Sequence, residues 1–336
     1  MATIEEMALD SIKKEFLSAF INQRERNVKT LNFQVPLESD DGTLYHISAT
    51  YTGDINADLV LVTHHGATYN KSYWDWPQQP DVYSFVKYIT NRQLLNNVGC
   101  KRRRNNNIAV LSIDRLGAGR SDHPDSSLVT YDHHAYYLHL INTIVKGFCR
   151  KVVAIGESLG SSLSQFESTT YNDYDGLVLM GYVHELYVTI PQLISLFYPA
   201  NNLPQYANLD SGYFTTIPGA RPFLYNVPTA NPGVIAYDDR TKDVVSLLDI
   251  QSHLAILLSP TDALQVKVPV FSLLGDVDKV FCSGPGCPEA AAEPSFWSPE
   301  AEFEFKLIPE TGHSMNLHPS AHTSYAYIYH WLSKKF

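Results

Sequence analysis

The pattern of hydrophobic and polar positions changes period along the chain. Over residues 4–26, apolar side chains recur at helical spacing, which predicts an amphipathic helix that packs on the rest of the protein. Residues 30–36 and 45–51 instead alternate apolar and polar side chains, and Glu38-Ser39-Asp40-Asp41-Gly42 lies between them. This arrangement predicts a β-hairpin, so the sheet is expected to begin with antiparallel strands.

Short apolar runs follow, and such runs are typical of strands that are buried on both faces of a sheet. The predicted strands are residues 59–63, 108–113, 151–155, 176–180, 269–274 and 304–308. Four further helices are predicted. Three span residues 82–95, 131–148 and 321–332, and the fourth begins directly after Ser158. The alternation predicts an α/β fold in which a mostly parallel, doubly wound sheet has helices on both faces.

The alternation stops between residues 182 and 266. This span is rich in Pro, Tyr, Asn and Leu, and it is too long to be a simple loop. We interpret it as a mostly helical lid, inserted over the carboxyl edge of the sheet. The predicted organisation is a core made of residues 1–181 and 267–336, with an N-terminal helix within residues 1–27, and a lid or cap over residues 182–266.

Charge and composition limit the classes of partner. The 336 residues carry a formal net charge of −10 at pH 7, which argues against nucleic acid or an anionic membrane as the main partner. We interpret the basic run Lys101-Arg102-Arg103-Arg104 as a solvated loop. No apolar run approaches the roughly 18 residues of a transmembrane helix, and the acidic start lacks the apolar segment of a signal peptide. We therefore expect a cytoplasmic protein without stable membrane insertion, whose oligomeric state the sequence does not reveal.

The four cysteines are too few for a disulfide scaffold. Cys282 and Cys287 lie close together and could pair if oxidised, but we expect reduced thiols. Their spacing has no histidine partner that would suggest zinc, and no carboxylate–histidine cluster has metal-ligand spacing. The sequence therefore implies neither a metal nor another cofactor.

The strongest chemical signal is Gly156-Glu157-Ser158-Leu159-Gly160. A β-branched apolar run leads directly into it and small, helix-tolerant residues follow, so the context is strand, sharp turn and helix. Such a turn places the Ser158 hydroxyl at the tip of a strand. The backbone N–H of Leu159, at the start of the helix, could then help to bind an oxyanion. The alternative is a glycine-rich loop with an incidental serine.

A nucleophilic serine needs a base, and the base needs an orienting acid. Since catalytic groups gather at the carboxyl ends of parallel strands, the partners should follow later strands. Asp276 and Asp278 follow one such strand, and His313 follows the next. The order is therefore Ser, Asp, His, with Asp276 and Asp278 competing as the acid and Glu185 as a displaced alternative.

These stretches together resemble the α/β-hydrolase superfamily, in its serine esterase and lipase-like branch. His64-His65-Gly66-Ala67 is similar to the family's oxyanion turn. The run Asp114-Arg115-Leu116-Gly117-Ala118-Gly119-Arg120-Ser121 is similar to the Asp-x-x-Gly-x-Gly-x-Ser turn that follows the next strand. The resemblance covers residues 59–182 and 268–332 and implies the α/β-hydrolase fold.

The resemblance also implies roles for individual residues. The N–H of Ala67 would join that of Leu159 in an oxyanion hole. The family's acid usually lies three residues after a glycine, which favours Asp278, because Gly275 precedes it by three. His65, Tyr182 and His184 are expected substrate contacts, although such histidines also occur as structural core residues.

We therefore expect Ser158, Asp278 and His313 to form a triad that hydrolyses an ester, lactone or thioester through an acyl-enzyme. Apolar lid residues such as Phe197 and Leu257 should face the pocket, which suggests an apolar or aromatic small-molecule substrate. Two alternatives remain open. The same fold could serve as an acyltransferase, cyclase or lyase, or it could be a non-catalytic small-molecule receptor.

Overall fold

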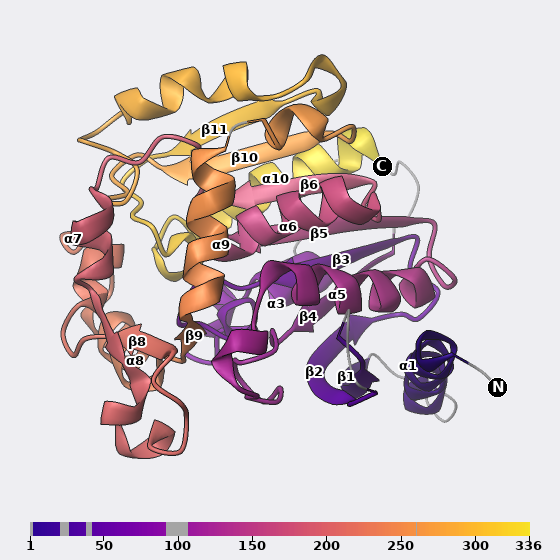
Figure 1. The fold of residues 1–336 in the computed structure, drawn as a ribbon. Helices are drawn as coiled ribbons and strands as arrows, with labels where there is room; N and C mark the ends of the chain where they lie inside the picture. Colours follow the sequence, from indigo (N-terminus) through magenta and orange to yellow (C-terminus); the bar gives the residue numbers. More distant parts are fainter. Residues whose placement is uncertain (1–2, 21–26, 38–41, 92–106, 260) are drawn as a thin grey trace.

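The computed structural model describes residues 3–20, 27–37, 42–91, 107–259 and 261–336. An eight-stranded sheet in the order β1-β2-β4-β3-β5-β6-β10-β11 forms its centre (Figure 1). The strands are β1 (Asn27–Val35), β2 (Tyr45–Gly53), β3 (Leu59–His64), β4 (Ile108–Ile113), β5 (Lys151–Glu157), β6 (Gly176–Met180), β10 (Val270–Gly275) and β11 (Glu304–Ile308). β1 pairs antiparallel with β2, and β2 with β4, whereas the remaining neighbours are parallel. The predicted hairpin and mostly parallel sheet are confirmed.

Helices cover both faces of this sheet. One layer contains α1 (Ile4–Phe20), α5 (Tyr131–Val145), α6 (Leu159–Tyr171) and α9 (Leu247–Leu258). The other contains α2 (Pro80–Tyr83), α3 (Phe85–Thr90) and α10 (Ala321–Lys335). Figure 1 shows α5 and α6 in front of the sheet and α10 behind it. The predicted doubly wound α/β architecture is therefore confirmed.

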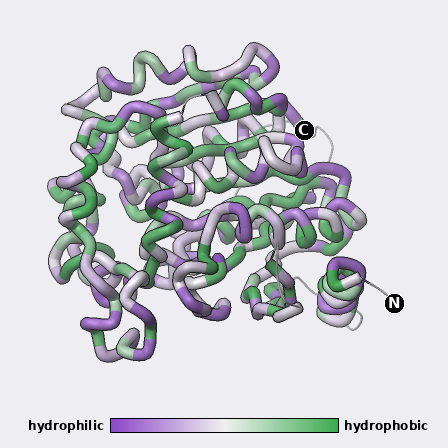
Figure 2. Tube along the Cα trace, in the orientation of Figure 1, coloured by the Kyte–Doolittle hydropathy of each residue, from purple (hydrophilic) through white to green (hydrophobic). Residues whose placement is uncertain are grey.

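Two hydrophobic cores result, one on each face. Val152 and Ala154 of β5 belong to the core under α5 and α6, whereas Val153 and Ile155 belong to the core under α10. The side chains of a strand alternate between faces, so a strand covered on both sides must be apolar throughout. Figure 2 shows hydrophobic stretches along the central strands, with hydrophilic residues more frequent in the outer loops.

The helix predicted over residues 82–95 is wrong in its first part. Ser84 has extended backbone angles and separates α2 from α3. Its side chain accepts from Lys87 N at the start of α3 and donates to Asp75 Oδ1 at 2.6 Å. These two hydrogen bonds favour a helix cap over helix continuation at this position. Residues 92–95, like the basic run Lys101–Arg104 and Cys100, lie outside the described residues.

The segment between β6 and β10 contains both helices and a small sheet. Its elements are α7 (Ile190–Ile194), β7 (Phe197–Pro199), β8 (Tyr213–Thr216), α8 (Pro232–Thr241), β9 (Val245–Ser246) and α9. β8 pairs antiparallel with β7 and with β9. The expectation of a mostly helical segment missed this sheet, because strands of two to four residues are too short to show an alternating pattern. Figure 1 shows the segment beside one end of the central strands.

Short 3₁₀ turns complete the described elements. They span Lys71–Tyr73, Ser126–Leu128, Ala200–Asn202, Pro204–Tyr206, Arg221–Leu224, Ala263–Gln265, Pro288–Phe296, Pro299–Ala301 and Met315–Leu317.

The loop after β10 carries a disulfide between Cys282 and Cys287, whose Cα atoms are 4.6 Å apart. The expectation of reduced thiols is thus wrong for this pair, whose cysteines are five residues apart in the chain. Among the described helices, none has the length and apolar character to cross a bilayer.

Candidate active site

Ser158 lies in a sharp turn between β5 and α6. Its φ of 52° is in the sparsely populated left-handed region, and its N–H donates to Met180 O at 2.8 Å. A Cβ on Gly156 would overlap Gly160 O, and a Cβ on Gly160 would overlap His64 O. Glycine is therefore required at both positions, and the strand–turn–helix context predicted for the candidate nucleophile is present.

Asp278 and His313 meet beyond the carboxyl ends of β10 and β11. His313 Nδ1 lies 2.8 Å from Asp278 Oδ2, and Asp278 Oδ1 accepts from Val280 N at 2.9 Å. Asp276 has no such contact, and its buried Oδ1 has no hydrogen-bond partner in the described part of the chain. Glu185 is exposed, so it is not the acid beside the buried His313. The geometry therefore pairs His313 with Asp278.

The electrostatic environment favours the protonated form of His313. Burial opposes the charged imidazole, but attraction to Asp278, the hydrogen bond to it and attraction to Glu157 outweigh burial. Together they raise the pKa of His313 to about 9. An imidazole in this environment holds a proton readily, which suits a group that receives one during a reaction.

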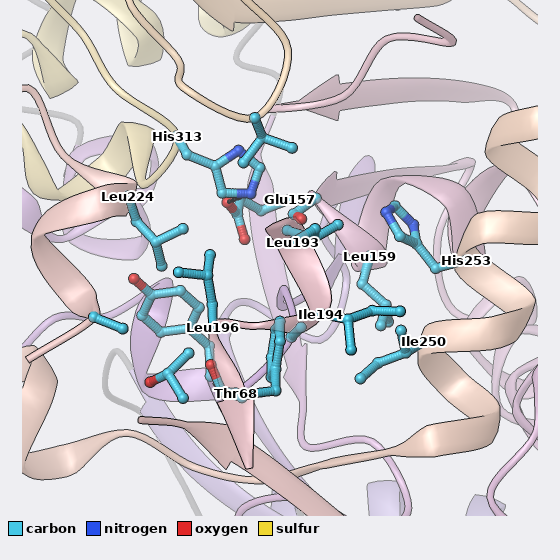
Figure 3. Close-up of a pocket in the computed structure, with 17 residues that line it drawn as sticks. Thr68, Glu157, Leu159, Leu193, Ile194, Leu196, Leu224, Ile250, His253 and His313 are labelled. Atoms are coloured by element: carbon cyan, nitrogen blue, oxygen red, sulfur yellow. Dashed lines mark ion pairs between the residues drawn. The ribbon is translucent and has the colours of Figure 1, made fainter. Parts of the chain in front are cut away.

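Ser158 and His313 line the same pocket, whose volume is about 760 Å³ including the space at its opening (Figure 3). Most of the wall is apolar. The apolar side chains from the segment between β6 and β10 are Leu193, Ile194, Leu196, Phe197, Ala220, Leu224 and Ile250. Phe197 faces the pocket as expected, whereas Leu257 is buried in the core that contains α6, because it lies on another face of α9.

Ala67 and Leu159, the expected oxyanion donors, both line this pocket. Leu159 is the first residue of α6, and Ala67 lies in the loop after β3, which crosses close to the Ser158 turn. Gly66 permits this approach, because a Cβ there would overlap Glu157 Oε2. Arg115 supports the loop by donating from its guanidinium to His65 O and from its backbone N–H to His65 Nε2.

The three expected substrate contacts lie elsewhere. His65, Tyr182 and His184 are buried, and none belongs to the residues that line the pocket. The His65 ring contacts Gly66 O and Arg115 N, while His184 Nδ1 lies 2.9 Å from Glu293 Oε1. Their environments are those of structural residues within the core.

His253 and Glu157 are two of the polar pocket residues that were not identified from the sequence as functional; the others are Thr68, Tyr69 and Thr216. His253 of α9 lines the wall beside Leu159, and its Nδ1 lies 2.7 Å from Ser162 Oγ. Burial lowers the pKa of His253 to about 3, so this ring stays neutral. Glu157 also lines the pocket, and burial raises its pKa to about 7. The sequence around His253 contains no motif that indicates a functional role, whereas Glu157 lies within the motif recognised around Ser158.

In the described residues, no group of three or more His, Cys, Asp or Glu side chains could hold a metal ion.

The parallel sheet, the turn at Ser158 and the acid–histidine pair after the last two strands define the class of α/β-hydrolase folds. The chain belongs to the alpha/beta hydrolase family, whose model matches residues 59–321. This match confirms the family resemblance found in the sequence. No curated protein sequence matches the chain significantly.

Solved structures share the fold at low sequence identity. A thermophilic esterase from Thermogutta terrifontis is 17% identical, with a TM-score of 0.54, and the match covers 90% of this chain and 98% of that chain. A soluble variant of monoglyceride lipase from Saccharomyces cerevisiae is 13% identical, with a TM-score of 0.60 and coverage of 94% and 96%. A 2-hydroxy-6-oxo-6-phenylhexa-2,4-dienoate hydrolase from Rhodococcus sp. strain RHA1 is 14% identical, with a TM-score of 0.53 and coverage of 91% and 99%. At these identities the likeness concerns the fold alone.

Proposed function

We propose that this protein is a serine hydrolase that cleaves an ester, lactone or thioester of an apolar small molecule. The observation that carries the proposal is the 2.8 Å contact between His313 Nδ1 and Asp278 Oδ2 at the wall of the pocket that Ser158 also lines. Family membership supports hydrolysis, and the serine at the turn favours an acyl-enzyme over an aspartyl ester.

The proposed reaction has two halves. Ser158 Oγ attacks the substrate carbonyl while its proton passes to His313 Nε2, and the N–H groups of Leu159 and Ala67 bind the resulting oxyanion. His313 then gives the proton to the leaving oxygen or sulfur, and an acyl-enzyme remains. Water attacks this ester, its proton passes to His313, and transfer of that proton to Ser158 Oγ releases the acid. Asp278 holds the ring orientation and stabilises the imidazolium.

In this proposal the segment of residues 182–266 is a lid that supplies most of the apolar wall. Burial of an acyl or aryl group against Leu193, Ile194 and Phe197 would contribute roughly 25 cal/mol for each Å² removed from water. This lining supports an apolar or aromatic substrate. Because the pocket opens to solvent, water can reach the acyl-enzyme, which favours hydrolysis over acyl transfer.

The test combines a covalent probe with turnover. A fluorophosphonate should label the wild-type protein at Ser158, and Ser158→Ala should abolish both labelling and hydrolysis, with a loss on the order of 10⁴-fold or more in kcat. Thermal melts of both proteins provide the folding control. Equal labelling or full turnover by the folded Ala variant would contradict the mechanism. Ligand binding without labelling or turnover would favour the receptor alternative.

A further inference from the structure

Glu157 is a fully buried carboxyl group. Within the described part of the chain, neither of its side-chain oxygens has a hydrogen-bond partner. A buried carboxylate without partners is costly, and it usually either is neutralised or interacts with a nearby positive charge. The proposed reaction described above gives this side chain no task.

The positive charge that attracts this carboxyl most strongly is that of His313, ahead of that of Arg221. Glu157 Oε1 lies 3.8 Å from His313 Nε2, while Asp278 Oδ2 lies 2.8 Å from His313 Nδ1. The two carboxyls thus approach different nitrogens of one imidazole. Figure 3 shows Glu157 next to the His313 ring at the pocket wall. Gly66 leaves the room that this carboxyl occupies.

We propose that Glu157 is a positioning residue that acts through His313, stabilising the imidazolium from its Nε2 side and thereby setting the pH at which His313 becomes a base. The inference rests on the proposed function for its consequence in catalysis. At 3.8 Å the interaction is charge attraction rather than a hydrogen bond. The proton received from Ser158 therefore stays on Nε2 until the leaving group takes it, and Glu157 exchanges no proton in the reaction.

The ionisation of Glu157 itself decides when this attraction operates. Burial raises its pKa to about 7, despite the opposing attraction of His313. Below that pH Glu157 is largely neutral, and above it the carboxylate supports the charged ring. Removing the charge must then lower the pKa of His313, because an opposite charge within this distance favours the protonated form.

Several other titratable groups face Glu157. Asp278 lies beyond the imidazole, and Arg221 pairs with Asp238 at 3.4 Å, so the charges of these two largely offset each other at Glu157. Tyr69 and Tyr73 also face the carboxyl, and burial raises the pKa of both phenols well above 10, which keeps them neutral.

Two further histidines face His313. Burial lowers the pKa of His253 to about 3 and that of His318 to about 4, so neither carries charge near neutrality. Among Glu157, the two phenols and the three histidines, therefore, Glu157 and His313 are the groups whose charge changes between pH 6 and 10.

The first test is the pH profile of kcat/KM for Glu157→Gln in the full-length protein. The acid limb should move to lower pH by about one unit or more, and the rate on the plateau should fall, because the imidazolium loses one stabilising charge. Glu293→Gln is the matched control, since Glu293 is an equally buried carboxyl that pairs with His184 away from the pocket. The acid limb of the kcat/KM profile of Glu293→Gln should coincide with that of the wild-type protein. An unshifted limb in folded Glu157→Gln would overturn the inference.

The second test needs no activity and no change at Glu157. In Ser158→Ala protein, the NMR signals of the His313 ring should shift in two steps, near pH 7 as Glu157 ionises and near pH 9 as the ring loses its proton. A single step would overturn the inference. Two steps in this variant, combined with no ester hydrolysis by the wild-type protein, would contradict the proposed function and leave the coupling intact. Hydrolysis by the wild-type protein, combined with a single step in the variant, would do the reverse.

Discussion

His253 Nδ1 and Ser162 Oγ, 2.7 Å apart, join α9 to α6 directly beside the Ser158 turn. Ser162 Oγ also lies 2.9 Å from Leu159 O, so the contact reaches the first residue of α6. One nitrogen of the His253 ring is thus fixed, and Figure 3 shows the ring extending from α9 toward the pocket. We expect the other nitrogen to bind a polar atom of a substrate, since His253 lines a mostly apolar wall.

His253→Phe should therefore separate polar from apolar substrates. For esters with a polar atom near the carbonyl, kcat/KM should fall roughly 3- to 10-fold, the worth of one neutral hydrogen bond. Simple alkyl esters should change little. Steady-state kinetics on matched pairs of esters provide the measurement, and an equal loss on both would indicate a structural role only.

Asp278→Asn should reduce kcat on the order of 10⁴-fold, because an amide neither stabilises the imidazolium nor fixes the correct tautomer. Asp276→Asn should cost less than about tenfold, since Asp276 makes no contact with His313. Both variants are compared with wild type in ester hydrolysis and in thermal melts. The reverse ranking would identify Asp276 as the acid and refute the pairing described above.

Phe197 and Leu257 provide a matched pair within the segment between β6 and β10. Phe197→Ala should change the preferred acyl chain length with little loss of stability, because Phe197 is half-buried and lines the pocket. Leu257→Ala should instead reduce the free energy of unfolding by roughly 2–5 kcal/mol, because Leu257 is buried in the core. Hydrolysis of a series of acyl esters and denaturant melts test both. If Phe197→Ala unfolds with unchanged selectivity, the segment is not a lid.

Reactivity should rise with pH well above the range of an ordinary histidine. The proposed base must be neutral to accept the Ser158 proton, and the pKa of His313 is raised to about 9. Fluorophosphonate labelling of wild type should therefore increase from pH 7 to pH 9 and level off above it, rather than levelling off near 7. The rate constant of labelling at fixed probe concentration measures this. A plateau already reached at pH 7 would mean that His313 is neutral in the resting protein.

The sequence predicted the sheet because its signals are local. Each buried strand is a short apolar run, and the motif around Ser158 needs only five residues in order. The partners of buried polar groups are not local. His184 pairs with Glu293 and His253 with Ser162 across 109 and 91 residues, so nothing near either histidine indicates where it points. The choice of Asp278 over Asp276 required the family resemblance, since both follow the same strand.

The strand order has a consequence for the order of events during synthesis. β10 and β11, which carry Asp278 and His313 at their ends, join the sheet beside β6 only after the long segment of residues 182–266 has been made. The turn that holds Ser158 can form much earlier, from β5 and α6. In the proposed mechanism, Ser158 is therefore synthesised long before Asp278 and His313, the pair that would activate it. The time at which Ser158 becomes reactive would then show when β10 and β11 have joined the sheet. A probe that reacts only with an activated serine would therefore measure the rate of the last step of folding.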